Sequence, residues 1–88
     1  MIQEVSFLEL LEKEKEAVFK YNLSLDRISN ELKFHNQRLI ENQEDKGYLD
    51  FIIHLHGERM EEALLEKNKA EENLRIARKD LKEYLNCL

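Results

Sequence analysis

Two rows of mainly apolar residues, each with a seven-residue repeat, constrain this chain more than any other feature. The first row contains Leu11, Val18, Leu25, Leu32 and Leu39. The second row contains Ile53, His56, Met60, Ala63, Lys67, Ala70, Leu74, Ala77, Leu81, Tyr84 and Leu88. Repeats of this period are typical of helices that pack side by side as a coiled coil. We therefore predict an all-α fold, an antiparallel two-helix hairpin of the coiled-coil type.

The predicted register follows from folding the chain at Gly47. In this register Leu11 meets Tyr84 and Leu39 meets His56. In the layers between, leucine or valine of the first half faces alanine of the second half, so the helices are expected to approach closely. A polar stretch ending at Gly47 separates the two rows, and glycine is the usual left-handed residue after a helix.

Local signals set the expected ends of the first helix. Ser6 and Glu9 have the spacing of a capping box, in which the serine side chain caps the helix and the glutamate reaches back. We therefore expect the first helix at about 7–44 and the turn at about 45–47. Asp45 is an alternative residue for the start of the second helix.

The second helix is expected at about 48–86. Residues 48–57 lie near two glycines and are apolar enough to form either a helix or a short buried strand. The seven-residue repeat continues through Ile53 and His56 without a change of phase, which favours the helix.

Length and composition indicate that the hairpin is incomplete alone. The chain has 88 residues, 38% of them charged, and no proline, which suits one domain (1–88) of long exposed helices. Two helices cannot enclose a core, and the lone Cys87 provides no disulfide. We therefore expect completion as a four-helix bundle, either by a homodimer or by another protein.

Charge and hydropathy disfavour several classes of partner. The net charge is −5 and is spread along the chain, whereas a nucleic-acid surface needs clustered Lys and Arg. No apolar run approaches the roughly 20 residues that span a bilayer, and no signal peptide is recognisable. We expect a cytoplasmic protein without a membrane or nucleic-acid partner.

No set of residues indicates catalysis or cofactor binding. His54 and His56 are two positions apart and point in different directions on a helix, so they do not form a metal site. Cys87 has no second cysteine and no neighbouring base. We expect no enzyme activity, no metal and no cofactor; burial of His35 and His56 would resist protonation and make assembly pH-dependent.

Apolar residues outside the two rows gather near the turn and predict an interaction surface. They are Phe34, Ile40, Tyr48, Phe51, Ile52 and Leu55. Other apolar residues outside the rows include Phe19, Leu64 and Leu65.

The functional hypothesis is a non-enzymatic module for protein–protein interaction: a small adaptor, chaperone or inhibitor that acts through the apolar patch near the turn. One alternative is a small regulator that binds nucleic acid or metal, through the histidines or through the basic cluster of Arg75, Arg78, Lys79 and Lys82. Another is an acidic, phage-type inhibitor that imitates nucleic acid. Because acidic and basic residues alternate along the chain, the pattern weakens that last alternative.

Overall fold

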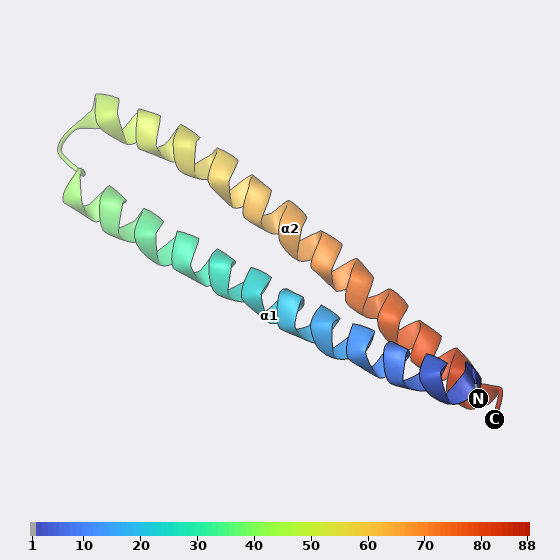
Figure 1. Ribbon diagram of the computed structural model, residues 1–88. Coiled ribbons are helices and arrows are strands. Elements are labelled where there is room, and N and C mark those ends of the chain that lie inside the picture. Colours follow the sequence, from blue (N-terminus) through green and yellow to red (C-terminus); the bar gives the residue numbers. More distant parts are fainter. Residues whose placement is uncertain (1) are drawn as a thin grey trace.

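The protein is a helical hairpin, as predicted. The computed structural model describes residues 2–88, with side chains from Phe7 onward. It contains helix α1 (Ile2–Glu41) and helix α2 (Lys46–Asn86), and no strand within that range. The two helices run antiparallel, and both ends of the chain lie at the extremity opposite the turn (Figure 1).

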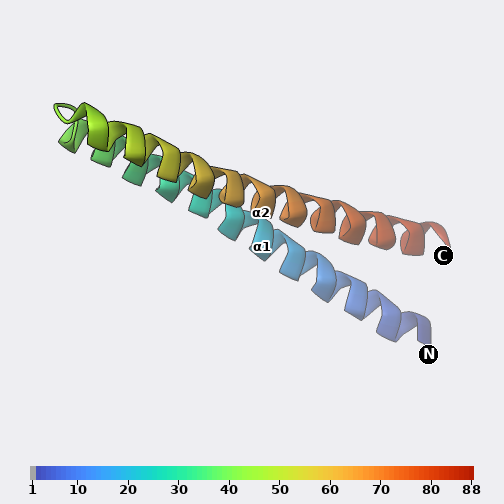
Figure 2. The same cartoon turned by 90° about the horizontal axis from the view of Figure 1, so that it is seen from above.

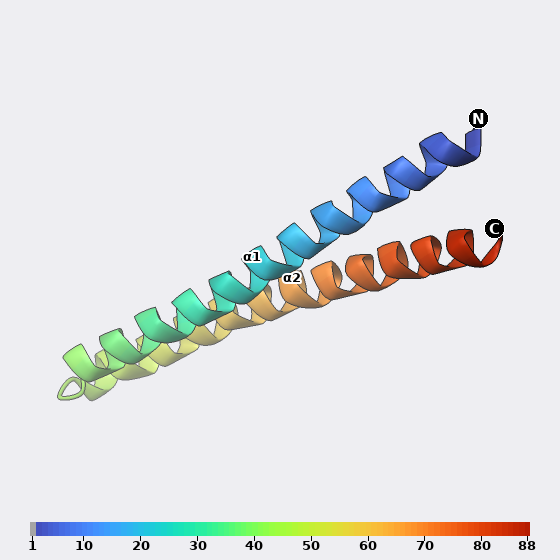
Figure 3. The ribbon, with the colours of Figure 1, turned by 90° about the horizontal axis from the view of Figure 1, so that it is seen from below.

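The hairpin is long and thin, and its helices twist about each other. Its extents are 66 × 15 × 14 Å. The ribbons separate toward the turn in Figure 1, whereas in the perpendicular views of Figures 2 and 3 they separate toward the termini. Such a twist is the expected result of a seven-residue repeat, because the straight α-helix has 3.6 residues per turn.

Helix α1 differs from its predicted bounds at both ends. It begins at Ile2, so Ser6 lies within the helix and the proposed capping box is not its start. It ends at Glu41 rather than near Glu44. The amide Nδ2 of Asn42 donates to the carbonyl oxygen of Arg38 at 2.8 Å, which satisfies one of the carbonyls left open at the helix end.

The start of α2 is capped by Asp45. The backbone N–H of Tyr48 donates to Asp45 Oδ1 at 3.1 Å, the usual geometry of an N-cap. The prediction that Gly47 closes the first helix in a left-handed conformation is wrong, because Gly47 lies in the first turn of α2 and no glycine among residues 2–88 has a positive φ. Residues 48–57 are helical, which confirms the prediction for that stretch.

The observed register differs from the predicted one by about one helical turn. Phe7, not Leu11, stacks on Tyr84, with ring centroids 5.3 Å apart. His56 packs against His35, with ring centroids 3.6 Å apart, at the level where Leu39 was expected. The turn begins at Asn42, some three residues earlier than predicted, and this moves every facing pair toward the N-terminus of α1.

Small residues from both helices occupy the centre of the contact. Ala17 and Ser24 are buried on α1, and three alanines at seven-residue spacing are buried on α2: Ala63, Ala70 and Ala77. Larger side chains are buried at only a few positions in the described part of the chain, among them Ile52, His56 and Leu74, and most of the leucines lie at the edge of the contact. Leu25 and Leu32 are 40% and 49% exposed, and Ile53 is 56% exposed, although all three were predicted to lie inside the seam.

Candidate functional site: an apolar groove on one side of the hairpin

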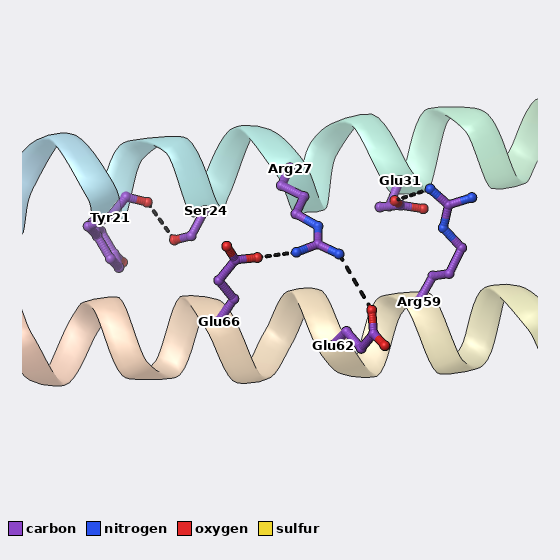
Figure 4. A network of polar contacts seen from close by, with 7 residues as sticks. All are labelled: Tyr21, Ser24, Arg27, Glu31, Arg59, Glu62 and Glu66. Atoms are coloured by element: carbon purple, nitrogen blue, oxygen red, sulfur yellow. Dashed lines mark hydrogen bonds and ion pairs between the residues drawn. The ribbon is translucent and has the colours of Figure 1, made fainter.

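The two lengthwise sides of the hairpin differ in chemistry, and one of them is bridged by ion pairs between the helices. Arg27 of α1 pairs with both Glu62 and Glu66 of α2, and Arg59 Nη2 of α2 donates to Glu31 Oε1 of α1 at 3.0 Å (Figure 4). Glu31 is 9% exposed. These contacts link the helices directly and fix their register on this side.

An apolar groove lies along the other side of the contact. Its lining residues are Leu32, His35, Leu39, Ile53, Gly57, Met60, Glu61 and Leu64. Leu32 follows Arg27 by five residues, a rotation of about 140° around α1, which places the two side chains on different sides. We call this feature the apolar groove.

The apolar groove occupies the half of the hairpin near the turn. On α2, the seven-residue row of Gly57 and Leu64 continues toward the termini with Glu71 and Arg78, so this edge of the groove side becomes charged. Lys67 Nζ pairs with Glu71 at 2.6 Å, and Arg78 Nε pairs with Glu14 of α1 at 3.5 Å. The apolar groove therefore ends at a charged stretch, and beyond it Leu85 of the same row lines a separate apolar pocket near the termini with Phe7, Leu8, Tyr84 and Leu88.

Gly57 widens the groove at its middle. A Cβ atom added to Gly57 would meet nothing within 4 Å, so the missing side chain is not required by the packing of the hairpin itself. Glycine in a helix interior costs about 1 kcal/mol relative to alanine. Within the hairpin alone this cost has no compensating contact.

Two histidines lie beneath the groove. His56 is 1% exposed, and neither of its ring nitrogens has a hydrogen-bond partner among the described residues. Burial lowers the pKa of His56 below its usual value, and the neighbouring His35, Arg38 and Arg59 lower it further, whereas Glu31 acts in the opposite direction. Uptake of a proton by this buried imidazole is therefore disfavoured.

Three of the six predicted interface residues form an aromatic cluster at the turn, which we call the aromatic tip: Phe34, Tyr48 and Phe51. The Arg38 guanidinium lies 5.3 Å from the Phe34 ring centre and donates to the Tyr48 hydroxyl at 3.0 Å. Tyr48 stacks on Phe51 at 6.3 Å. Arg38 thus links Phe34 to the Tyr48–Phe51 pair, and Phe51 remains 59% exposed.

The other three predicted residues do not extend the aromatic tip into one surface. Ile52 is fully buried, so the expectation that it lies outside the seam is wrong; α2 is rotated so that Ile52 replaces Ile53 between the helices. Leu55 is half-buried. Ile40 is 68% exposed and lies about 200° around α1 from Arg38, on the opposite face from that cluster.

Sequence reasoning missed the groove because it assigned most of its residues to the seam. The seven-residue rows include Leu32, Leu39, Ile53 and Met60. These side chains were expected to be buried in the contact between the two helices. The available signal was the row of alanines, because small residues on one helix can face small residues on the other and leave the leucines outside. Leu64 was noted only as an apolar residue outside the rows.

The residues considered for metal or nucleic-acid binding are engaged within the hairpin or stand apart. His54 Nε2 lies 3.3 Å from Glu58 on the surface. In the basic cluster, Arg75 pairs with Glu72, Arg78 with Glu14 and Lys79 with Glu83. Among the described side chains no three His, Cys, Asp or Glu residues lie together as a metal-binding group. Over the same part of the chain, neither helix has an apolar stretch that would cross a membrane.

Comparisons of the chain with protein-family models, with curated proteins and with solved structures found no match in any of the three.

Proposed function

We propose that this hairpin is a non-enzymatic protein-interaction module and that the apolar groove is its contact surface. The observation that carries the proposal is the difference between the two sides of the hairpin. One side is bridged by interhelical ion pairs, which surround its exposed Leu23 and Phe34 with charge, whereas the other leaves leucine, isoleucine and methionine side chains together in a groove. Contiguous apolar surface of this kind is typical of protein interfaces.

The shape of the groove suits an amphipathic helix. Its walls are two antiparallel helices with apolar residues at seven-residue spacing, the arrangement that receives the ridge of a third helix in bundles. A helix that lies in a groove is recognised through apolar anchors three, four and seven residues apart. Half-buried residues such as Leu32 and Leu64 already contact their own hairpin on one side and offer the other side to the incoming helix.

Adjacent leucines provide a matched pair of positions for a test. Leu64 lines the groove and is 45% exposed, whereas Leu65 is not among the groove residues and is 65% exposed. A photo-crosslinking residue such as p-benzoylphenylalanine would replace Leu64 in one variant and Leu65 in the other, in the cells that produce the protein. We expect covalent protein adducts at position 64 and few at position 65. The absence of adducts at position 64, or equal adducts at both positions, would contradict the proposal.

A further inference from the structure

We infer that the occupant of the apolar groove is a second copy of this chain, placed alongside the first with both turns at the same end. The inference rests on the proposed function of the groove and specifies its partner. The result would be a four-helix bundle in which α1 of each copy packs on α2 of the other, around a two-fold axis parallel to the long axis.

The composition of the internal contact indicates that more burial is required. The buried apolar residues of the described hairpin are four alanines with Ile52 and Leu74, and alanine contributes little apolar area. The larger side chains lie at the edge of the contact, where a second layer of helices would bury them. A two-fold axis along the hairpin places Leu39 of one copy near Ile53 of the other, and Leu32 near Met60, because these residues line the groove at matching levels.

Full overlap of one lengthwise side provides the area of a stable dimer, whereas the half near the turn alone falls short of it. A lengthwise side of the hairpin, 66 Å long and 15 Å wide, offers about 1,000 Å² per copy. The half near the turn alone would bury about 1,000 Å² over both copies, and full overlap would bury about 2,000 Å². Stable interfaces bury about 1,200–2,000 Å² in total.

The charges bordering the groove permit two acidic chains to meet. The row of α1 next to the groove leucines contains Asn22, Ser29 and Asn36, which are exposed and uncharged. Glu61 is the charged residue among those that line the groove. In the arrangement with both turns together, the two α2 helices are diagonal to each other, so the two Glu61 carboxylates lie on opposite edges of the interface.

The position of the charged residues favours this orientation over the opposite one. Lys67, Glu71, Arg78 and Glu14 lie on the groove side in the half near the termini. A second copy in the reverse direction would cover these ion pairs with the apolar half of its own groove, and burying ion pairs against apolar surface costs free energy. With both turns at one end, the two apolar grooves meet each other, the charged stretches meet each other, and the apolar residues near the termini, Leu8 and Leu85, meet their counterparts.

The first test is the solution mass of purified protein, by light scattering over a dilution series. We expect wild type and Leu65→Asp at twice the chain mass of 10.6 kDa. Leu64→Asp should shift the dimer–monomer midpoint to at least a tenfold higher concentration, because it places a carboxylate in the interface. A wild-type monomer at every concentration, or equal behaviour of the two variants, would overturn the inference. Loss of helicity together with association in Leu64→Asp alone would support it, since folding and association would then be coupled.

The second test concerns orientation and uses the exposed Cys87, near the end of α2. With both turns together, the two Cys87 thiols lie at one end, and a short bis-maleimide should join them. In the reverse arrangement they would lie about the full 66 Å length apart, and no crosslink would form. Cys87→Ser and Leu64→Asp serve as controls, because both should remove the crosslinked dimer. A dimer of the correct mass without the crosslink would overturn the proposed orientation.

The two proposals can fail separately. A monomeric purified chain that still forms adducts with another protein from position 64, but not from position 65, would overturn the second copy as occupant and leave the proposed function standing. A monomeric chain without adducts at position 64 would overturn both.

Discussion

His35 of α1 and His56 of α2 lie with their ring centroids 3.6 Å apart, and the planes of the two rings are inclined at 72°. His56 also contacts the edge of Phe34, at 5.8 Å. A histidine between an aromatic ring and a second histidine, with both nitrogens unsatisfied, is poorly placed to take up a proton. This contact therefore links the stability of the turn half to pH.

We predict that stability decreases as the pH falls through about 6.5, the usual pKa of histidine. The pKa of His56 is lowered in the folded state, so the unfolded chain binds the proton first and is favoured over this range. Thermal unfolding followed by circular dichroism at pH 8 and pH 5.5 measures the effect. His56→Leu should reduce the difference between these two pH values, whereas His54→Asn, at an exposed position, should retain it. An unchanged pH dependence in His56→Leu would show that other groups cause it.

We predict that Arg59→Ala destabilises the hairpin by about 1–2 kcal/mol. Arg59 is the hydrogen-bond partner of the buried Glu31, and removing it leaves a carboxylate with little access to water. The estimate is below the value for a fully buried pair because the Arg59 side chain is 47% exposed.

Urea unfolding of Glu31→Ala, Arg59→Ala and the double variant would give the coupling energy of this pair. Arg75→Ala is the control, because its ion pair with Glu72 lies on the surface and should contribute no measurable stability. Equal effects of Arg59→Ala and Arg75→Ala would argue against a structural role for the buried pair.

We predict that Ala70→Leu destabilises the hairpin by about 1–3 kcal/mol. Ala70 is 9% exposed at the closest part of the contact, and a larger side chain would force the helices apart. Chemical unfolding measures the loss, with Asn68→Leu as a control at an exposed position of the same helix. If both variants had wild-type stability, the alanine row would not lie in a close contact.

We predict that Asp45→Ala costs about 1 kcal/mol, because it removes the acceptor for the backbone N–H of Tyr48. Asp45→Asn should retain most of the stability. In contrast to a glycine that closes a helix, Gly47 should tolerate alanine, whose Cβ would lie 3.8 Å from Asp45 Oδ1 without strain. A large loss of stability in Gly47→Ala would contradict the helical conformation described for this residue.

The fold was predictable because the seven-residue rows and the polar interruption between them have few solutions. The register was not predictable, because the glycine at position 47 led to a predicted turn that is too late in the sequence. Asp45, which was recognised as an alternative, caps α2 and places the turn earlier. A difference of a few residues in a turn moves every facing pair, and the sequence near residues 42–47 contains signals for both positions.

The apolar groove was harder to predict than the hairpin, since the same leucines suit both a two-helix and a four-helix contact. Their assignment depends on how closely the helices approach, and that distance is set by Ala17 and Ser24 meeting alanines across the contact. The sequence placed these two residues beside the leucine row but gave no direct indication that they, rather than the leucines, would be central. Phe34, Tyr48 and Phe51 remain predicted contact residues that the fold gathers at the turn.

The ion pairs that join Arg27 of α1 to Glu62 of α2, and Arg59 of α2 to Glu31 of α1, also bear on how an assembly can grow. On the lengthwise side that they bridge, charged groups surround the exposed Leu23 and Phe34, whereas the apolar groove offers a neighbour mainly apolar side chains. A subunit with contact surfaces on two sides can assemble into filaments, whereas a subunit with one such surface forms a closed complex with a single neighbour. With the apolar groove as its single contact surface, the hairpin would form a closed complex rather than a filament.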